Sequence, residues 1–160
     1  AFRPTSELPT HLAVHAALRR SGSRCRAVLH SHPTELLALT HLPALTQERL
    51  NRLLWSMTPE TVVLAPAGVA RVPYLPPGSP EIGAATARAV QRHELVLWEK
   101  HGATVVGEDL ATAFDLLDAV NKSAVLYLAC RTAGFQPRGL DEQQVAALRR
   151  GIAKKPTADS

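Results

Sequence analysis

Two histidines separated by a single serine, His30 and His32, directly follow an apolar run that has the length of a β-strand. Residues i and i+2 of a strand project from the same face, so both imidazoles are expected to point toward one place. Neutral imidazole nitrogen suits zinc and its first-row neighbours, and a catalytic zinc commonly has three protein ligands. His101 is the best candidate for the third ligand, because it follows another apolar stretch and Gly102 permits a tight turn beside it.

The chain offers other histidines, and an H-x-H pair at the end of a strand can also be an ordinary surface feature. His11 and His15 form a competing pair at i and i+4 of an expected helix, but they lack the acid of an H-E-x-x-H zinc site. We interpret that pair as packing residues. His41 and His93 look like histidines of a loop or a helix end.

Two acids and one hydroxyl complete the set of residues that could do chemistry. Glu7 lies in the first turn of the first expected helix, where a carboxylate is favoured by the helix dipole but could instead serve as a general base near a metal. Ser6 is expected to cap this helix, and a helix start with free hydroxyls can bind phosphate. Glu60, between Pro59 and a β-rich stretch, allows a structural or a functional interpretation.

Apolar periodicity and turn residues predict the elements that position these side chains. Helices are expected over residues 7–20, 34–40, 46–55, 80–91, 110–130 and 140–150, with Asp109 as the cap and Gly134 as the end of the fifth. Strands are expected over residues 25–31, 69–72, 95–98 and 104–106, and residues 61–64 also have strand-like composition. The order predicts an α/β fold in which helices cover a sheet.

Several motifs occur together in a characteristic order. They are T-S-E-L-P-T-H at 5–11, H-S-H-P-T at 30–34, L-W-S-M-T-P-E at 54–60, P-G-S-P-E-I-G-A-A-T-A at 77–87, L-V-L-W-E-K-H-G at 95–102 and N-K-S-A at 121–124. With these motifs, which span almost the whole chain, the sequence resembles the class II sugar-phosphate aldolases, and among them those that cleave rhamnulose 1-phosphate.

The resemblance implies an α/β fold with a central, mainly antiparallel sheet between helical layers, assembled as a homotetramer with active sites between subunits. It implies zinc as the cofactor and a function for each matching residue. The matching residues are His30, His32 and His101 as zinc ligands, Glu7 as the acid/base, Glu60 as a carboxylate supplied to the neighbouring subunit, and Ser6 near the substrate phosphate.

The implied reaction is reversible cleavage of L-rhamnulose 1-phosphate, or a similar ketose 1-phosphate, into dihydroxyacetone phosphate and L-lactaldehyde through a zinc-stabilised enediolate. Two alternatives remain open at this point. One is epimerisation of a pentulose phosphate, which related members perform, and the other is a catalytically silent zinc-binding module.

Length and composition limit the remaining function classes. The 160 residues predict a single domain over 1–153 with a polar tail over 154–160. The resemblance implies that this domain is class II aldolase-like and lacks the segment that precedes the S-E-L-P motif in the family. The net charge of +4 comes from scattered basic residues, and aromatics make up only 4%, so we expect anionic small molecules rather than nucleic acid as partners. Two cysteines and the lack of any apolar run of about 20 residues favour a cytoplasmic protein without a membrane span.

Overall fold

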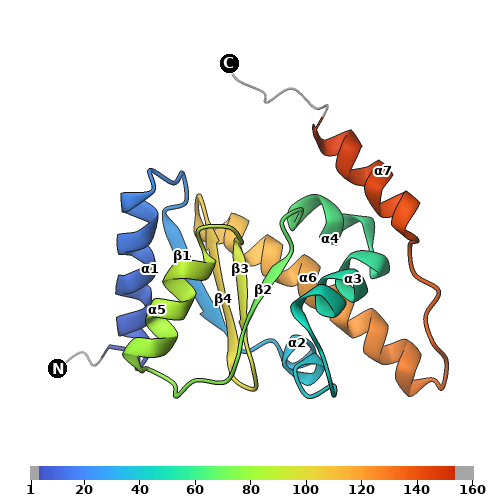
Figure 1. The fold of residues 1–160 in the computed structure, drawn as a ribbon, viewed down its shortest axis with the longest axis horizontal. Helices are drawn as coiled ribbons and strands as arrows, with labels where there is room; N and C mark the ends of the chain where they lie inside the picture. Colours follow the sequence, from blue (N-terminus) through green and yellow to red (C-terminus); the bar gives the residue numbers. More distant parts are fainter. Residues whose placement is uncertain (1–3, 154–160) are drawn as a thin grey trace.

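The computed structural model describes residues 4–153 of the chain. Its elements are α1 Leu8–Arg20, β1 Ala27–Ser31, α2 Thr34–Leu39, α3 Gln47–Met57, α4 Pro59–Leu64, β2 Val69–Val72, α5 Pro80–Ala89, β3 Leu95–Trp98, β4 Gly102–Gly107, α6 Leu110–Thr132 and α7 Glu142–Ala153 (Figure 1). The proposed tail, 154–160, lies outside the described residues.

The four strands form one sheet in the order β1-β4-β3-β2. β4 is antiparallel to both of its neighbours, whereas β2 runs parallel to β3. In the β1–β4 pair, His30 lies opposite Thr104 and Ser31 opposite Ala103. This register places the end of β1 beside the start of β4, and the expected mainly antiparallel sheet is confirmed.

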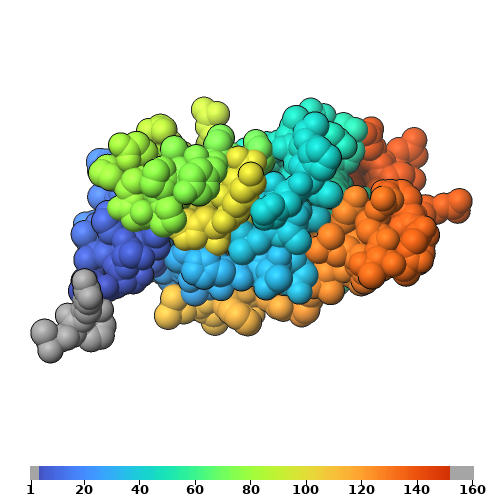
Figure 2. Space-filling model, turned by 90° about the horizontal axis from the view of Figure 1, so that it is seen from below, coloured from blue at the N-terminus to red at the C-terminus, as the bar shows by residue number. Residues whose placement is uncertain are grey.

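Helices cover both faces of this sheet. As a result, β3 and β4 are buried along their whole length, and each strand presents alternate side chains to two cores. On one face, Val96, Trp98 and Val106 pack with α1 and α5, which lie side by side at one end of the molecule (Figure 2). On the other face, Leu95 and Leu97 pack with α2, α3 and α6. The layered α/β prediction is therefore confirmed.

Local capping explains several element boundaries. The Asp109 side chain accepts a hydrogen bond of 2.7 Å from the Thr112 backbone N–H, which starts α6 as predicted. After α6, Gly134 adopts a left-handed φ of +90°, a conformation that glycine allows at a helix end. Ser79 caps α5 in the same way as Asp109 caps α6.

Two local predictions are wrong. The strand-like stretch 61–64 belongs to the helix α4, because Thr58 caps that helix, Pro59 occupies its first position, and the Thr61 hydroxyl bonds to Ser123 on α6 at 2.7 Å. Ser6 does not cap α1. Glu7 holds the cap position instead, and its side chain makes no capping hydrogen bond.

Within the described residues, no helix is long and apolar enough to span a membrane. Cys25 and Cys130 are both half-buried free thiols.

Candidate metal centre

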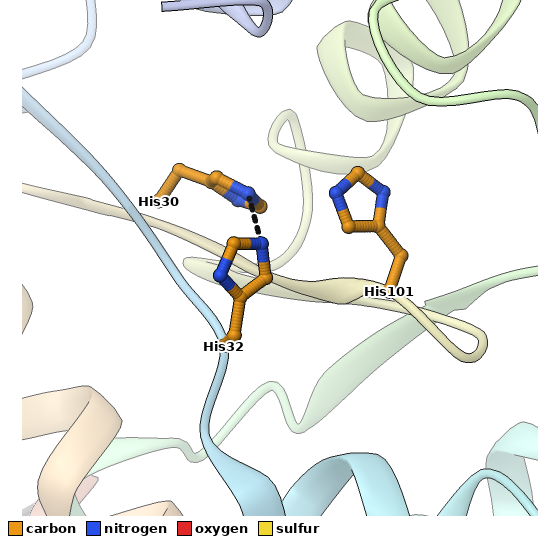
Figure 3. A group of neighbouring side chains, drawn as sticks. All are labelled: His30, His32 and His101. Carbon is orange, nitrogen blue, oxygen red and sulfur yellow. Dashed lines mark hydrogen bonds between the residues drawn. The ribbon is translucent and has the colours of Figure 1, made fainter.

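The three predicted histidine ligands converge at one edge of the sheet. His30 is in β1, His32 follows this strand, and His101 lies in the turn between β3 and β4, so the β1–β4 register joins segments about 70 residues apart in the chain. One donor nitrogen from each ring lies within 4.8 Å of the others. Figure 3 shows the three rings pointing toward a common point.

Gly102 permits this convergence. A Cβ atom built on Gly102 would lie 2.8 Å from His30 Cε1, 2.8 Å from His32 Cδ2 and 2.8 Å from the Ser31 carbonyl oxygen. These contacts are shorter than those that real Cβ atoms make. The two rings therefore occupy the space that a side chain at position 102 would need.

His30 is held in one orientation by the backbone. Its Nδ1 lies 3.0 Å from the Ala103 carbonyl oxygen, which can only accept, so Nδ1–H is the donor and Nε2 presents its lone pair. His30 Nε2 lies 3.1 Å from His32 Nε2 (Figure 3). A backbone carbonyl behind the ring is one of the common partners of a metal-binding histidine.

The surroundings of His30 and His101 favour the neutral form of these two imidazoles. Burial, followed by the proximity of His32 and His101, lowers the pKa of His30 to about 4. Burial also lowers the pKa of His101, against an opposing effect of the Glu7 carboxylate. Neutral imidazole is the form that binds metal, so His30 and His101 can bind a cation without first losing a proton.

The donor set fits zinc. Two nitrogens bound tetrahedrally at ~2.0–2.1 Å would lie about 3.3 Å apart, which is close to the 3.1 Å between the Nε2 atoms of His30 and His32. Glu7 Oε2 is buried and has no hydrogen-bond partner among the described residues. Such a carboxylate oxygen is costly unless a cation or a polar ligand satisfies it.

Glu7 lies beside the three histidines. Its side chain is only 5% exposed, and Oε1 is 3.9 Å from His101 Nε2. The carboxylate makes no capping hydrogen bond at the start of its own helix. The structure brings Glu7 to the histidines, and its role as the acid/base stays a prediction.

The other two candidate residues, Ser6 and Glu60, are both exposed. Ser6 is exposed immediately before Glu7, and its backbone carbonyl is in close contact with Gly78. Glu60 is exposed in the first turn of α4, in the helical layer on the other face of the sheet, and is not brought to the histidines within its own chain. The roles of both residues stay predictions.

The competing histidines do not join the cluster in the part of the chain that the structure describes. His11 and His15 are half-buried on α1, where burial and the neighbouring His15 lower the pKa of His11. His93 Nδ1 hydrogen-bonds to the Gly68 carbonyl at 3.1 Å, and His41 is exposed after α2. These placements agree with their interpretation as structural residues.

One neighbour of the cluster, Trp98, is absent from the sequence-based candidates. Its ring stacks on His30 at a centroid distance of 4.6 Å and an interplanar angle of 30°. The available signal was a tryptophan three residues before His101 at the end of an aliphatic strand. Its contact with His30 depends on strand pairing, which the sequence pattern does not supply.

Comparisons with known proteins agree on one family. The family model described as Class II Aldolase and Adducin N-terminal domain matches residues 1–128. Rhamnulose-1-phosphate aldolase from Bacteroides thetaiotaomicron is 44% identical over 149 residues, covering 92% of this chain and 55% of the relative. The enzyme of the same name from Mannheimia succiniciproducens is 40% identical, with 93% and 56% covered. The chain thus spans about half the length of the curated relatives it matches.

Solved structures show the same fold. A sugar-phosphate aldolase from Thermotoga maritima superposes with a TM-score of 0.78 at 34% identity, over 87% of this chain and 59% of that one. An L-fuculose 1-phosphate aldolase superposes with a TM-score of 0.68 at 20% identity, over 96% of this chain and 66% of that one, which supports the fold alone.

Proposed function

Because the chain belongs to the class II aldolase and adducin N-terminal domain family, we propose that it acts as a zinc-dependent aldolase that reversibly cleaves L-rhamnulose 1-phosphate to dihydroxyacetone phosphate and L-lactaldehyde. The observation that carries this proposal is the convergence of His30, His32 and His101 beside the unpartnered Glu7 carboxylate. The names of relatives at 44% and 40% identity support the choice of substrate.

His30, His32 and His101 would hold the metal. When bound, zinc supplies a Lewis acid that stabilises the negative charge developing on the dihydroxyacetone phosphate half. The protein's own residues manage the protons. The bond between C3 and C4 breaks, its electron pair remains on C3, and the C4 hydroxyl becomes the aldehyde as it loses its proton.

Glu7 would deliver a proton to C3 in cleavage and remove it in synthesis. Its position supports this role because the carboxylate is buried beside His101 and no described side chain or backbone group uses its Oε2 atom. A general acid or base must be within reach of the carbon that it serves and free of competing partners. Ser6, exposed beside Glu7, would contact the substrate phosphate.

The proposal includes a homotetramer, acting in the cytoplasm, with active sites between subunits. Glu60 supports this assembly because it is exposed on α4 and separate from its own chain's histidines. In a tetramer, Glu60 of one subunit would receive the C4 hydroxyl proton at a neighbour's site. Residues 1–153 would act as one domain.

The test combines metal content with product analysis on one sample. We expect one zinc per chain and release of dihydroxyacetone phosphate from rhamnulose 1-phosphate, with both lost in His30→Ala. Glu7→Gln should keep the zinc and lose at least about 100-fold in kcat, the scale of general acid–base catalysis. Glu81→Gln, which neutralises an exposed acid in the first turn of α5, is the control and should change neither.

Two outcomes would contradict the proposal. Zinc-free protein that still cleaves the substrate would reject the metal centre, and formation of an epimeric pentulose phosphate without cleavage of rhamnulose 1-phosphate would reject the aldolase reaction.

A further inference from the structure

Trp98 forms one wall of the metal centre. The residue is 1% exposed, its indole stacks on His30, and its ring centroid is also 5.0 Å from that of His101, at an interplanar angle of 49°. Two of the three metal-binding rings therefore rest against the same side chain. The orientation of this indole limits the orientations that the two imidazoles can take.

A buried threonine on α5 fixes the indole. Trp98 Nε1–H donates to Thr86 Oγ1 at 2.9 Å, and the Thr86 hydroxyl donates in turn to the Ile82 carbonyl at 2.7 Å. The direction is unambiguous, because an indole N–H can only donate and a carbonyl can only accept. Thr86 is 0% exposed, so no solvent competes for either bond.

His30 is thus constrained from two sides. The Ala103 carbonyl holds Nδ1, and the Trp98 face limits rotation of the ring about that hydrogen bond. Groups behind the ligands orient them and commonly affect metal affinity strongly. The chain of contacts runs from the Ile82 carbonyl through Thr86 and Trp98 to His30.

We propose that Thr86 is a positioning residue of the metal centre and acts through Trp98. The inference rests on the proposed zinc site and extends it to α5. Thr86→Val keeps the shape of the side chain but removes the acceptor, so the indole N–H loses its partner and the ring is free to shift. Thr86→Ser keeps the hydroxyl.

The experiment measures zinc affinity by competition with a chromophoric chelator, using the full 160-residue chain. We expect Thr86→Val to raise the zinc Kd roughly 10-fold or more, within the 10–100-fold range typical of partners behind metal ligands, and Thr86→Ser to restore the affinity. Thr61→Val is the matched control. It removes a buried, hydrogen-bonded threonine hydroxyl on the opposite side of the sheet, so it should lower stability without changing the Kd.

Tryptophan fluorescence provides a second readout. The chain has two tryptophans, so a Trp55→Phe background leaves Trp98 as the single reporter. Zinc binding should change Trp98 emission because His30 stacks on its ring, and Thr86→Val should alter the emission of both the metal-free and the zinc-bound protein. A merely structural role for Thr86 would change the unfolding midpoint but leave the zinc Kd as in the parent.

Absence of the zinc site and absence of a positioning role for Thr86 give different results. No zinc binding by the parent chain would reject the metal centre itself. Zinc binding with equal Kd in the parent and in folded Thr86→Val would overturn the positioning role alone. If Thr86→Val does not fold, Trp98→Phe tests the same bond from its other end, and an unchanged Kd in that variant would also overturn the proposal.

Discussion

Replacing Gly102 with alanine should weaken zinc binding strongly while the protein still folds. The added Cβ would lie 2.8 Å from carbon atoms of His30 and His32 and 2.8 Å from the Ser31 carbonyl oxygen, so these groups must move apart by about 0.6 Å to reach ordinary contact at 3.4 Å. Gly102 has a negative φ or an extended backbone rather than a left-handed one, so alanine adds no backbone strain. The effect is therefore a displacement of two ligands.

Such a displacement is large for a metal site. Ligand distances in an intact site fall within roughly 0.2 Å of their ideal values, so a shift of about 0.6 Å is incompatible with both histidines binding one ion. We expect the zinc Kd to rise at least about 100-fold, which corresponds to about 2.7 kcal/mol of binding free energy. The unfolding free energy of the metal-free protein should fall by about 1–3 kcal/mol, the usual cost of overpacking.

The assay is zinc competition together with urea unfolding in the presence of a chelator. Gly83→Ala and Gly151→Ala are matched controls on helices, because a Cβ at Gly83 makes only ordinary contacts of 3.5 Å or more and one at Gly151 meets nothing within 4 Å. Both should bind zinc normally and gain about 0.5–1 kcal/mol in stability, as glycine is unfavourable inside helices. Zinc affinity of Gly102→Ala equal to that of the parent would refute the crowding argument.

Three further predictions concern acidity, core polarity and the C-terminal helix. Since the pKa of His30 falls from 6.5 to about 4 on folding, the unfolded chain binds the proton more strongly, so metal-free stability is full above pH 6.5 and declines toward pH 4. After allowance for screening of this partly exposed ring, the loss of unfolding free energy should be about 1–2 kcal/mol. Urea unfolding of the parent and of His30→Gln measures it, and an equal pH dependence of stability in both proteins would exclude the His30 contribution. Asn51→Ala should cost about 2–4 kcal/mol, because the buried Asn51 amide bonds both the N–H and the carbonyl of Val69 at 2.7 and 3.0 Å; a thermal midpoint unchanged from the parent would contradict this. Arg149→Met should destabilise the packing of α7, because the Arg149 guanidinium lies 3.8 Å from the centre of the Trp55 ring. The lost contact should cost about 0.5–1 kcal/mol, and we expect faster amide hydrogen exchange across residues 142–150.

Local patterns in the chain are sufficient for much of the fold. Asp109 and Gly134 mark the two ends of α6, Ser79 starts α5, and the apolar runs at 95–98 and 69–72 are strands, because capping, glycine conformation and β-rich composition act within a few residues. The H-x-H spacing likewise aims His30 and His32 at one point, since alternation along a strand is a local property.

Contacts between distant segments decided the rest. The stretch 61–64 has strand-like composition but is helical, because the distant Thr61–Ser123 hydrogen bond to α6, added to the local Thr58 cap, outweighs a weak intrinsic preference. The pairing of β1 with β4 brings His101 to His30, and the packing of α5 on β3 brings Thr86 to Trp98. The placement of Glu7 beside His101 similarly depends on how α1 packs on the sheet. Composition and spacing do not specify such contacts, because strand register and helix packing are set by the shape of the whole core.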